Sequence, residues 1–350
     1  INLIGEHVDY HDGFVLPDCI SLGIQFAIKL NDTSCIRLWA EDLKEGVETD
    51  LPIVQPSEVS WANFFTGVVA QLQERGVEVP GFDCAFSANL PIGAGLSSSA
   101  ALESGIGIAL NQLLGLGLDR PTLALIGQKA EHTYVGVMCG IMDQFASLMG
   151  KDGHVFKLDC RSLDYEHVPF PTGQYDILLV NSMVKHALSD SGYNDRRNES
   201  ESGLAVLQST YPDIQALRDV NLNQVMDPTL EMDPLIRKRS RFVVEEISRV
   251  HAFAQALKHQ DYPALGPLLF ASHQGLQNDY EVSCEELDFL VELAKRTPEV
   301  IGARMMGGGF GGCTINLVEK GKSDSFITVW QQQYQQQFGK LPEYYLMQIG

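Results

Sequence analysis

The segment Gly93–Ala101, which reads Gly-Ala-Gly-Leu-Ser-Ser-Ser-Ala-Ala, constrains the fold more than any other part of the chain. It follows an alternating strand pattern at Phe82–Ala88 and leads into a helix of small residues expected from about Ser98 to Leu114. Two glycines let the backbone approach a ligand closely, and the serines are expected to cap the helix and to leave its first N–H groups facing outwards. A helix N-terminus carries a partial positive charge, so this segment is a candidate phosphate site. The competing interpretation is a glycine turn into an ordinary serine-capped helix.

Composition excludes several classes of protein. The 350 residues correspond to about two domains. With 25 basic and 45 acidic residues, the net charge of -20 disfavours nucleic acid and anionic membrane surfaces as partners. No apolar run reaches the roughly 18 to 20 residues of a membrane helix. The 7 cysteines are scattered and never spaced as CxxC, which argues against a zinc site or a disulfide scaffold and favours free thiols in a cytoplasmic protein.

Strand and helix patterns are mixed along the chain without a regular βαβ alternation, which predicts an α+β fold. Strands are expected at 22–30, 35–40, 82–88, 154–159 and 175–181, and helices at 61–75, 98–114, from 121 and at 324–338, with a mostly helical region from 193 to 296. The segments 301–306 and 313–318 flank a glycine run, and a final strand is expected after the last helix. Asp119 is placed to cap the helix that begins near residue 121. Two prolines and a glycine between 161 and 175 predict a domain boundary, with domains at 1–165 and 166–350.

The opening segment Asn2–Gly13 crowds acidic and polar groups around one glycine. Glu6, His7 and Asp9 together offer hydrogen-bond acceptors and a donor, a combination that suits a polyhydroxylated ligand. Two other interpretations fit the same residues: a solvated turn ahead of a strand, and a metal site built from His7, Asp9 and His11. The residues alone leave all three open.

One carboxylate stands among apolar residues in the segment Gly140–Gln144. An aspartate in such a segment is costly to bury without a partner, so Asp143 is expected to be either a helix cap or a functional carboxylate. Glu131 lies upstream on the preceding predicted helix. Spacing does not decide whether Glu131 pairs with Asp143 or occupies an exposed helix position.

Two later segments are further candidates. The run Gly307–Gly312 holds five glycines in six positions, which costs conformational entropy on ordering. Close approach of the backbone to a ligand or to another loop is the usual compensation. The segment Tyr193–Arg197 opens a helix, and its arginines are more typical of surface ion pairs than of ligand contacts.

These segments occur together in an order that resembles the galactokinases, within the wider GHMP group of small-molecule kinases that includes homoserine, mevalonate and phosphomevalonate kinases. From Asn2 onwards the opening segment resembles the signature Gly-Arg-x-Asn-Leu-Ile-Gly-Glu-His-x-Asp-Tyr. Gly93–Ser99 resembles the phosphate loop of the group, and Ala303–Gly312 resembles its third motif. The resemblance covers essentially the whole chain, and the first motif narrows the group to sugar kinases.

Three features depart from the family pattern. The Gly-Arg of the signature, whose arginine is the transition-state stabiliser of the family, would precede Ile1 and has no number in this sequence. Val8 and His11 stand where galactokinases often have Thr and Asn, and Met306 stands where Thr is common. None of these departures removes a residue to which the resemblance gives a catalytic role.

The resemblance implies a two-domain α+β fold, with an N-terminal domain like ribosomal protein S5 domain 2, a ferredoxin-like C-terminal domain and the active site between them. The implied reaction transfers the γ-phosphoryl group of ATP to the anomeric hydroxyl of D-galactose, giving galactose 1-phosphate, a step of galactose catabolism in the Leloir pathway. The implied partners are these small molecules and not nucleic acid or a membrane, for a cytoplasmic enzyme that is a monomer or weak homodimer.

The resemblance also implies roles for individual residues. Asp143 is the implied base toward the sugar hydroxyl, and Ser99 and Glu131 are the implied ligands of Mg²⁺. The residues implied to line the sugar pocket are Glu6, His7, Asp9, Gly140 and Tyr193. The residues implied to bind ATP are Gly93, Ala94, Gly95, Leu96, Ser97, Ser98 and Ser99, with Trp61 either near the adenine or a core aromatic on an amphipathic helix.

Two alternative functions stay open at the level of the sequence. One is a kinase of the same group that acts on N-acetylgalactosamine, another sugar or an isoprenoid alcohol. The Glu-His-x-Asp cluster disfavours an apolar substrate but does not separate related sugars. The other is a non-catalytic regulator that binds sugar and ATP, against which the intact Ser99, Glu131 and Asp143 argue.

Overall fold

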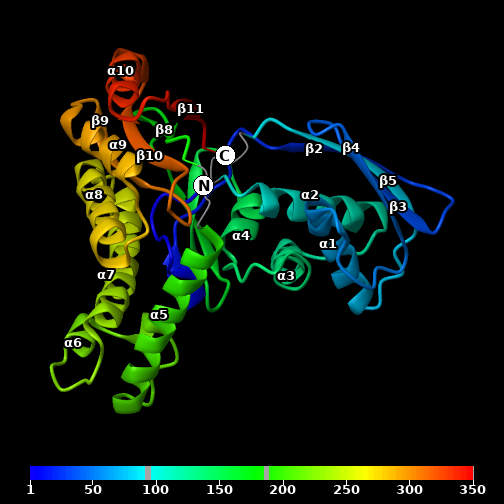
Figure 1. The fold of residues 1–350 in the computed structure, drawn as a ribbon, viewed down its shortest axis with the longest axis horizontal. Helices are drawn as coiled ribbons and strands as arrows, with labels where there is room; N and C mark the ends of the chain where they lie inside the picture. The colour runs from blue at the N-terminus through cyan, green and yellow to red at the C-terminus, as the bar shows by residue number, and fades with distance from the viewer. Residues whose placement is uncertain (91–95, 185–188, 350) are drawn as a thin grey trace. The chain divides into compact units, whose positions relative to one another are not determined.

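The computed structural model describes residues 1–90, 96–184 and 189–349. The chain forms two compact units, coloured along the sequence in Figure 1. The first unit combines Ile1–Ser21 with Gly150–Gly350, and the second combines Leu22–Ile92 with Ser97–Met149. Within the described ranges, no helix has both the length and the apolar character needed to cross a membrane.

The domain boundary predicted between residues 165 and 166 does not follow these units. It falls at the start of strand β7 (Tyr165–Pro169), which pairs antiparallel with β6 (His154–Asp159). Strand β6 pairs in turn with β1 (Phe14–Val15), so the opening residues fold with the second half of the chain. The prolines and glycine that indicated a boundary instead end β7 and form the turn before β8 (Tyr175–Asn181).

The second unit is a four-stranded sheet with helices on one face (Figure 1). Its strands in spatial order are β2 (Ile24–Leu30), β5 (Phe82–Ala88), β3 (Cys35–Ala40) and β4 (Glu45–Asp50), and its helices are α1 (Asn63–Glu74), α2 (Ser98–Leu113), α3 (Arg120–Ala130) and α4 (Met142–Met149). Along β3, Ile36 and Leu38 are buried whereas Arg37 and Trp39 are exposed, as expected where helices cover one face only. Strand β4 was not predicted, because it is a polar edge strand without an alternating apolar pattern.

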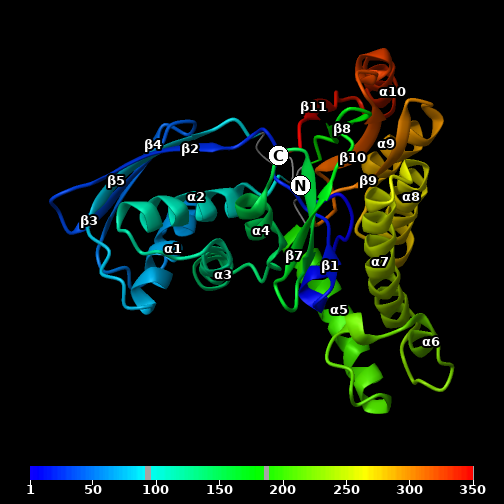
Figure 2. The same cartoon turned by 180° about the vertical axis from the view of Figure 1, so that it is seen from behind.

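The first unit contains two antiparallel sheets, β1-β6-β7 and a larger one ordered β11-β8-β10-β9 (Figure 2). Its further elements are α5 (Ser189–Thr210), α6 (Leu222–Val225), α7 (Pro234–Lys258), α8 (Leu265–Gly275), α9 (Glu285–Arg296), β9 (Val300–Met305), β10 (Cys313–Glu319), α10 (Ile327–Phe338) and β11 (Glu343–Met347). Helices separate β8 from β9, and α10 separates β10 from β11, which gives the β-α-β-β-α-β order of ferredoxin-like folds. The core of this part surrounds Leu290, Val318 and Trp330.

Local features of the sequence account for several helix ends. Helix α3 begins after Asp119, whose carboxylate accepts a hydrogen bond from the amide of Thr122 at 2.9 Å, as predicted. Helix α1 ends just before Gly76, which takes a left-handed conformation with φ of +82°. The mixture of helices and antiparallel strands confirms the α+β prediction.

Helix α7 anchors the opening segment from inside the first unit. Glu246 is buried on α7, and its Oε1 accepts hydrogen bonds from the amide of Gly5 at 2.9 Å and from the hydroxyl of Ser272 at 2.7 Å. Arg249 pairs with the other carboxylate oxygen at 2.6 Å. Gly5 has a φ of +104°, and a Cβ there would lie 2.9 Å from a backbone oxygen, so the position requires glycine. These contacts fix the backbone directly ahead of Glu6.

Candidate active site

In the first unit, the buried carboxylate of Glu6 holds together two motifs that are far apart in the sequence. Arg304, fully buried on β9, pairs with Oε1 of Glu6 at 3.1 Å, and the amide of Gly307 donates to the same oxygen at 2.8 Å. The guanidinium also donates to the carbonyl oxygens of Leu3 at 2.8 Å and Met305 at 2.6 Å. A buried charge pair persists only when its other polar groups are satisfied, and these contacts satisfy them. Glu6 therefore links the opening motif to the glycine run.

His7 follows Glu6 in a left-handed conformation, with φ of 60°, that is uncommon for a residue other than glycine. Its buried ring packs against the rings of Tyr193 and Tyr280, with centroid separations of 5.2 and 5.0 Å. Nε2 lies 3.2 Å from the carbonyl oxygen of Gly308, and Nδ1 lies 2.8 Å from the hydroxyl of Tyr10. Burial lowers the pKa of His7 to about 4, so the ring is neutral at neutral pH.

His11, the second histidine of the opening motif, is also buried, and its Nε2 lies 2.7 Å from Oγ of Ser200. Burial lowers the pKa of His11 to about 3. His7 and His11 therefore direct ring nitrogens to different protein partners, which gives no support to a metal site built from them and Asp9. Asp9 is half-buried at the start of a short 3-10 turn. Because most of the motif is buried, the interpretation as a solvated turn is wrong.

The glycine run lies close to other loops of its own chain. Gly309 has a φ of +88°, and a Cβ there would lie 2.1 Å from the carbonyl oxygen of Val282. A Cβ on Gly308 would lie 3.4 Å from the ring of Tyr193, which reaches this loop from α5. Close approach to another loop, one of the two reasons predicted for the glycines, is therefore confirmed.

In the second unit, the start of α2 meets two carboxylates. Ser97 is the N-cap residue of α2, but it has a left-handed conformation and its side chain makes no capping hydrogen bond. Its side chain instead forms a hydrogen bond with Asp143 at the start of α4, and that of Ser99 forms one with Glu131 at the end of α3. The prediction that serines cap this helix is therefore wrong for Ser97, whose left-handed backbone differs from the extended conformation of an ordinary N-cap residue.

Gln144, the residue after Asp143, bridges two buried glutamates. Its Nε2 donates to Oε2 of Glu103 at 3.0 Å and to Oε2 of Glu131 at 3.1 Å. The thiol of Cys139 also donates to Glu131, at 3.4 Å. Glu131 is 7% exposed, so the interpretation as an exposed helix position is wrong. It lies where α3 passes into a π-helical turn, a feature found frequently at functional sites.

Burial changes the protonation of this cluster. The pKa of Glu103 is raised to about 9 by burial and by the neighbouring charge of Glu131. Burial also raises the pKa of Glu131 and that of Asp143, although the hydrogen bond from Ser97 opposes the rise at Asp143. Glu103 is therefore mostly protonated at neutral pH, which removes one of three negative charges from the cluster.

The other residues predicted to bind ATP or sugar are only partly described. Gly93, Ala94 and Gly95 lie outside the described residues. Leu96 is buried and Ser98 is the first residue of α2. Gly140 is buried, and it follows Cys139, whose carbonyl oxygen lies 2.9 Å from Nε2 of His132.

Trp61 lies in the aromatic core of the second unit. Its ring packs against those of Phe86 and Phe65, with centroids 5.5 and 6.1 Å away and nearly perpendicular planes at Phe65. Its indole N–H donates to Glu45 at 3.0 Å. The ring is half-buried. This packing supports the interpretation as a core aromatic.

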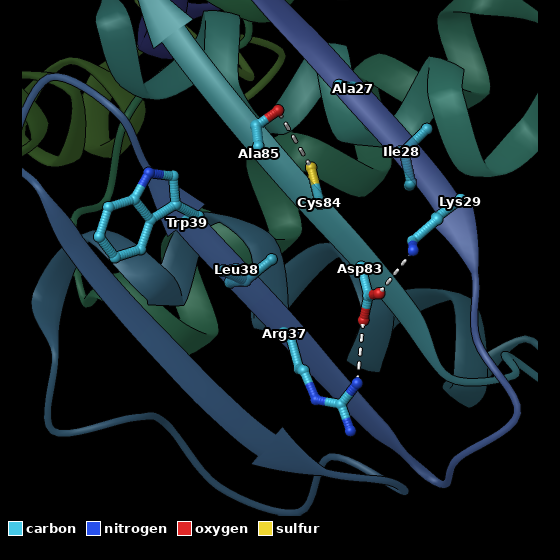
Figure 3. A pocket seen from close by; sticks show the side chains of 9 residues that line it. All are labelled: Ala27, Ile28, Lys29, Arg37, Leu38, Trp39, Asp83, Cys84 and Ala85. Atoms are coloured by element: carbon cyan, nitrogen blue, oxygen red, sulfur yellow. Dashed lines mark hydrogen bonds and ion pairs between the residues drawn. The ribbon is translucent and has the colours of Figure 1, made fainter.

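A hollow of about 460 Å³ lies on the open face of the sheet in the second unit (Figure 3). It is lined by Ala27, Ile28, Lys29, Arg37, Leu38, Trp39, Asp83, Cys84 and Ala85. Asp83 pairs with Lys29 and with Arg37 on the neighbouring strands, each at 3.4 Å. The Trp39 ring covers Gly46 on β4, where a Cβ would lie 3.0 Å from it. These are cross-strand contacts that stabilise a sheet, and none of the predicted site residues lines the hollow.

Comparison with known proteins shows to which family this chain belongs. Family models match the chain for the galactokinase galactose-binding signature over residues 1–30, the GHMP kinases N terminal domain over residues 63–151 and the GHMP kinases C terminal domain over residues 253–336. A galactokinase of Thermotoga maritima is 40% identical over 339 residues, which cover 97% of this chain and 93% of that protein. This chain belongs to the galactokinase family.

Solved structures agree with membership of the galactokinase family. The crystal structure of Lactococcus lactis galactokinase complexed with galactose is 37% identical, with a TM-score of 0.96 over 100% of this chain and 91% of that one. The mevalonate kinase of Methanococcus jannaschii, 18% identical with a TM-score of 0.64 over 100% of this chain and 96% of that one, shares the fold alone. The two-domain α+β fold of the GHMP kinases, implied by the sequence motifs, is confirmed.

Three residues that hold the predicted site residues in place, Arg304, Glu103 and Gln144, were not predicted from the sequence. Arg304 had a signal, because a charged residue in the apolar strand before the glycine run needs a buried partner. Glu103, inside a helix of small residues, and Gln144, beside Asp143, had weaker signals. Nothing in their spacing indicated that both would meet Glu131.

We predict that Glu103→Gln flattens the decline of stability with rising pH. The folded protein raises the pKa of Glu103 from 4.5 to about 9, so unfolding releases a proton between these values. The free energy of unfolding therefore falls as pH rises through this window, by up to ~1.4 kcal/mol per pH unit, and glutamine removes that dependence. Urea unfolding from about pH 5 to about pH 9 measures it, with the exposed Glu58→Gln as control. Parallel curves for Glu103→Gln and the wild type would contradict the assignment.

Proposed function

We propose that the protein transfers the γ-phosphoryl group of ATP to the anomeric hydroxyl of D-galactose, giving galactose 1-phosphate. The observation that carries the proposal is the buried, hydrogen-bonded arrangement of Glu6 and His7 within the residues that match the galactose-binding signature. Polar groups that the protein holds in place discriminate among sugar hydroxyls, because a wrong epimer leaves one of them unpaired. The residues proposed to line the sugar pocket are Glu6, His7, Asp9, Gly140 and Tyr193.

Asp143 is the proposed base. As the anomeric oxygen bonds to the γ-phosphorus, the bond from that phosphorus to the oxygen bridging to the β-phosphate breaks, and the hydroxyl proton passes to the Asp143 carboxylate. The hydrogen bond with Ser97 orients this carboxylate, and burial raises its pKa and with it its affinity for a proton. The reaction depends mainly on positioning and charge stabilisation, so one oriented carboxylate is sufficient as the proton acceptor.

The triphosphate is proposed to bind at the start of α2, where a helix N-terminus favours anions. The residues proposed to surround it are Gly93, Ala94, Gly95, Leu96, Ser97, Ser98 and Ser99. Trp61 is the candidate for contact with the adenine through the exposed part of its ring, although its packing against Phe65 and Phe86 favours the alternative of a core aromatic.

Ser99 and Glu131 are the proposed ligands of Mg²⁺. Among the described residues, no three or more His, Cys, Asp or Glu side chains gather in a metal-binding arrangement. The pair nevertheless fits this ion, because the two side chains are hydrogen-bonded to each other and offer hard oxygen donors. Mg²⁺ typically takes one or two protein ligands beside phosphate oxygens, and when bound it would neutralise charge on the phosphates. The hydrogen bonds from Gln144 and Cys139 hold the Glu131 carboxylate in position.

We expect the protein to act on its small-molecule substrates without a nucleic acid or membrane partner, as a cytoplasmic monomer or weak homodimer. The net charge of -20 supports the first part of this expectation, because such a chain repels phosphate backbones and anionic lipid.

We predict that Asp143→Asn lowers kcat by ~10² to 10⁴-fold while galactose and ATP still bind, because the amide keeps the shape but does not accept the proton. Coupled ADP release measures the rate, and calorimetry measures binding. The exposed Asp152→Asn is the control and should behave as the wild type. If Asp143→Asn kept about a tenth of the wild-type rate, Asp143 would not be the base.

We predict that Ser99→Ala and Glu131→Ala raise the Mg²⁺ concentration needed for half-maximal rate by at least about ten-fold. Each change removes an oxygen donor of the kind that this ion binds. Titration of Mg²⁺ at saturating ATP and galactose measures the effect, with Thr133→Ala as control, because that exposed hydroxyl bonds to the backbone of its own helix. An unchanged Mg²⁺ dependence in both variants would remove the assignment.

We predict that the wild type phosphorylates D-galactose at least ~10²-fold better in kcat/KM than D-glucose, its C4 epimer. A site that bonds the axial hydroxyl leaves a buried polar group unpaired with the wrong epimer, at a cost of ~1 to 3 kcal/mol for a neutral group and more for a charged one. ADP release across a sugar panel that includes N-acetylgalactosamine measures the preference. Equal kcat/KM for the two epimers would leave only a broader sugar kinase, and binding without ADP release would indicate a regulator.

Asp9 is the charged candidate for this discrimination. In the same assay, Asp9→Ala is expected to lose galactose activity and to flatten the preference between the epimers. A preference that survived in Asp9→Ala would leave the function in place and remove this role from the residue.

A further inference from the structure

A chain of hydroxyl groups connects the opening motif to the interior of the first unit. Nδ1 of His7 lies 2.8 Å from the hydroxyl of Tyr10, which lies 2.9 Å from the hydroxyl of the buried Tyr280. Oγ of Ser200 lies 3.3 Å from the hydroxyl of Tyr280. On the other side of the imidazole, Nε2 lies 3.2 Å from the carbonyl oxygen of Gly308. The histidine thus has a protein partner at each ring nitrogen.

The positions of the protons follow from this arrangement. A carbonyl oxygen only accepts, so Nε2 of His7 carries the proton directed at Gly308. Because burial lowers the pKa of His7 to about 4, the ring has no second proton at neutral pH and Nδ1 accepts. Tyr10 must therefore donate to Nδ1 and, with its one proton used, can only accept from Tyr280, whose hydroxyl lies closer to Tyr10, at 2.9 Å, than to its other acceptor, the carbonyl oxygen of Arg196, at 3.3 Å. Burial raises the pKa of Tyr10 well above its usual value and that of Tyr280 to about 12, so both hydroxyls keep their protons.

Arginine side chains fix the far end of this chain. Arg196 on α5 donates to the carbonyl oxygen of Tyr280 at 2.6 Å. Arg239, buried on α7, donates to the carbonyl oxygen of Asp279 at 2.5 Å and pairs with Glu281 at 2.8 Å. The residues on both sides of Tyr280 are thereby tied to two helices, so its hydroxyl stays within reach of Tyr10.

We propose that Tyr10 and Tyr280 are positioning residues for sugar binding, which donate in series to Nδ1 of His7 and hold it as a neutral imidazole with its proton on Nε2. The inference rests on the proposed galactokinase function and extends it to two residues outside the predicted sugar pocket. A galactose hydroxyl that replaces the Gly308 carbonyl at Nε2 must then accept a hydrogen bond. The other tautomer would place a lone pair there and would require a donor. The tyrosines thus set the polarity of one sugar contact.

Tyr10→Phe tests the proposal directly, because it keeps the ring and leaves Nδ1 of His7 buried without a donor. We expect KM for galactose to rise about ten-fold, with KM for ATP unchanged and kcat within about two-fold of the wild type. Tyr280→Phe leaves the Tyr10 donor in place, so its effect on KM should be smaller, about two- to three-fold. Tyr211→Phe is the matched control, because it removes a hydroxyl that bonds to Asp227 at 2.8 Å, outside the site.

Nitrogen-15 NMR of histidine-labelled protein separates this role from a general loss of packing, since the two ring nitrogens report which of them is protonated. We expect His7 of the wild type to carry its proton on Nε2, and we expect Tyr10→Phe to shift the Nδ1 signal to that of an acceptor without a donor. A wild-type His7 protonated on Nδ1 would overturn the proposal, even if Tyr10→Phe failed to fold. So would a folded Tyr10→Phe with unchanged galactose KM and unchanged His7 signals. A wild type that phosphorylated no galactose would contradict the proposed function, while the spectrum would still decide the tautomer.

Discussion

The buried ion pair between Glu6 and Arg304 is the constraint on which the arrangement of the opening motif and the glycine run depends. Removing two charges from water costs several kcal/mol per ion, so the pair adds little net stability, but the loss of one partner would cost roughly 3 to 5 kcal/mol. Because losing one partner costs far more than the intact pair contributes, the pair fixes the position of the opening motif against the glycine run. Any shift of the opening motif against the glycine run would leave a charge or the Gly307 amide without its partner. Glu246 on α7 holds the preceding amide from the other side, so Glu6 and His7 enter the site along one defined backbone path.

The second unit brings carboxyl groups of like charge close together, whereas the first unit pairs a carboxylate with a guanidinium of opposite charge. Glu103, Glu131 and Asp143 lie close together, and two features reduce the repulsion among their carboxyl groups. Protonation removes the charge of Glu103, and the amide of Gln144 donates to both glutamates at once. The helix lacks a serine cap, usually worth about 1 kcal/mol, because Ser97 has a left-handed conformation, and the Ser97 side chain forms a hydrogen bond with Asp143. Local departures of this kind are expected at functional sites, where the rest of the fold supplies the compensating stability.

The sequence predicted those parts of the structure that depend on neighbouring residues. The alternating apolar pattern predicted β5, and the capping residue Asp119 predicted the start of α3. Both features depend only on a few neighbouring residues. The pairing of β1 with β6 joins segments more than a hundred residues apart, and no local pattern records it, so the boundary at 165 was misplaced. The same limit applies to the site. Motifs identified Glu6 and Asp143, but burial and long-range contact decided that Arg304 would meet the first residue and that the Ser97 side chain would bond to the second.

In each of the two units burial favours the neutral forms of titratable groups, with different chemical results. It makes His7 a neutral donor of fixed direction, and it makes the carboxyl groups of the second unit better proton acceptors. The electrostatic demand of a triphosphate then follows from simple magnitudes. The N-terminus of α2 offers only about half a positive charge, whereas Glu131 and Asp143 bring up to two negative charges of their own. With Glu103 ionised there would be three. In the proposed site, a protonated Glu103 and the proposed divalent cation at Ser99 and Glu131 would together lower the repulsion between phosphate oxygens and carboxylates.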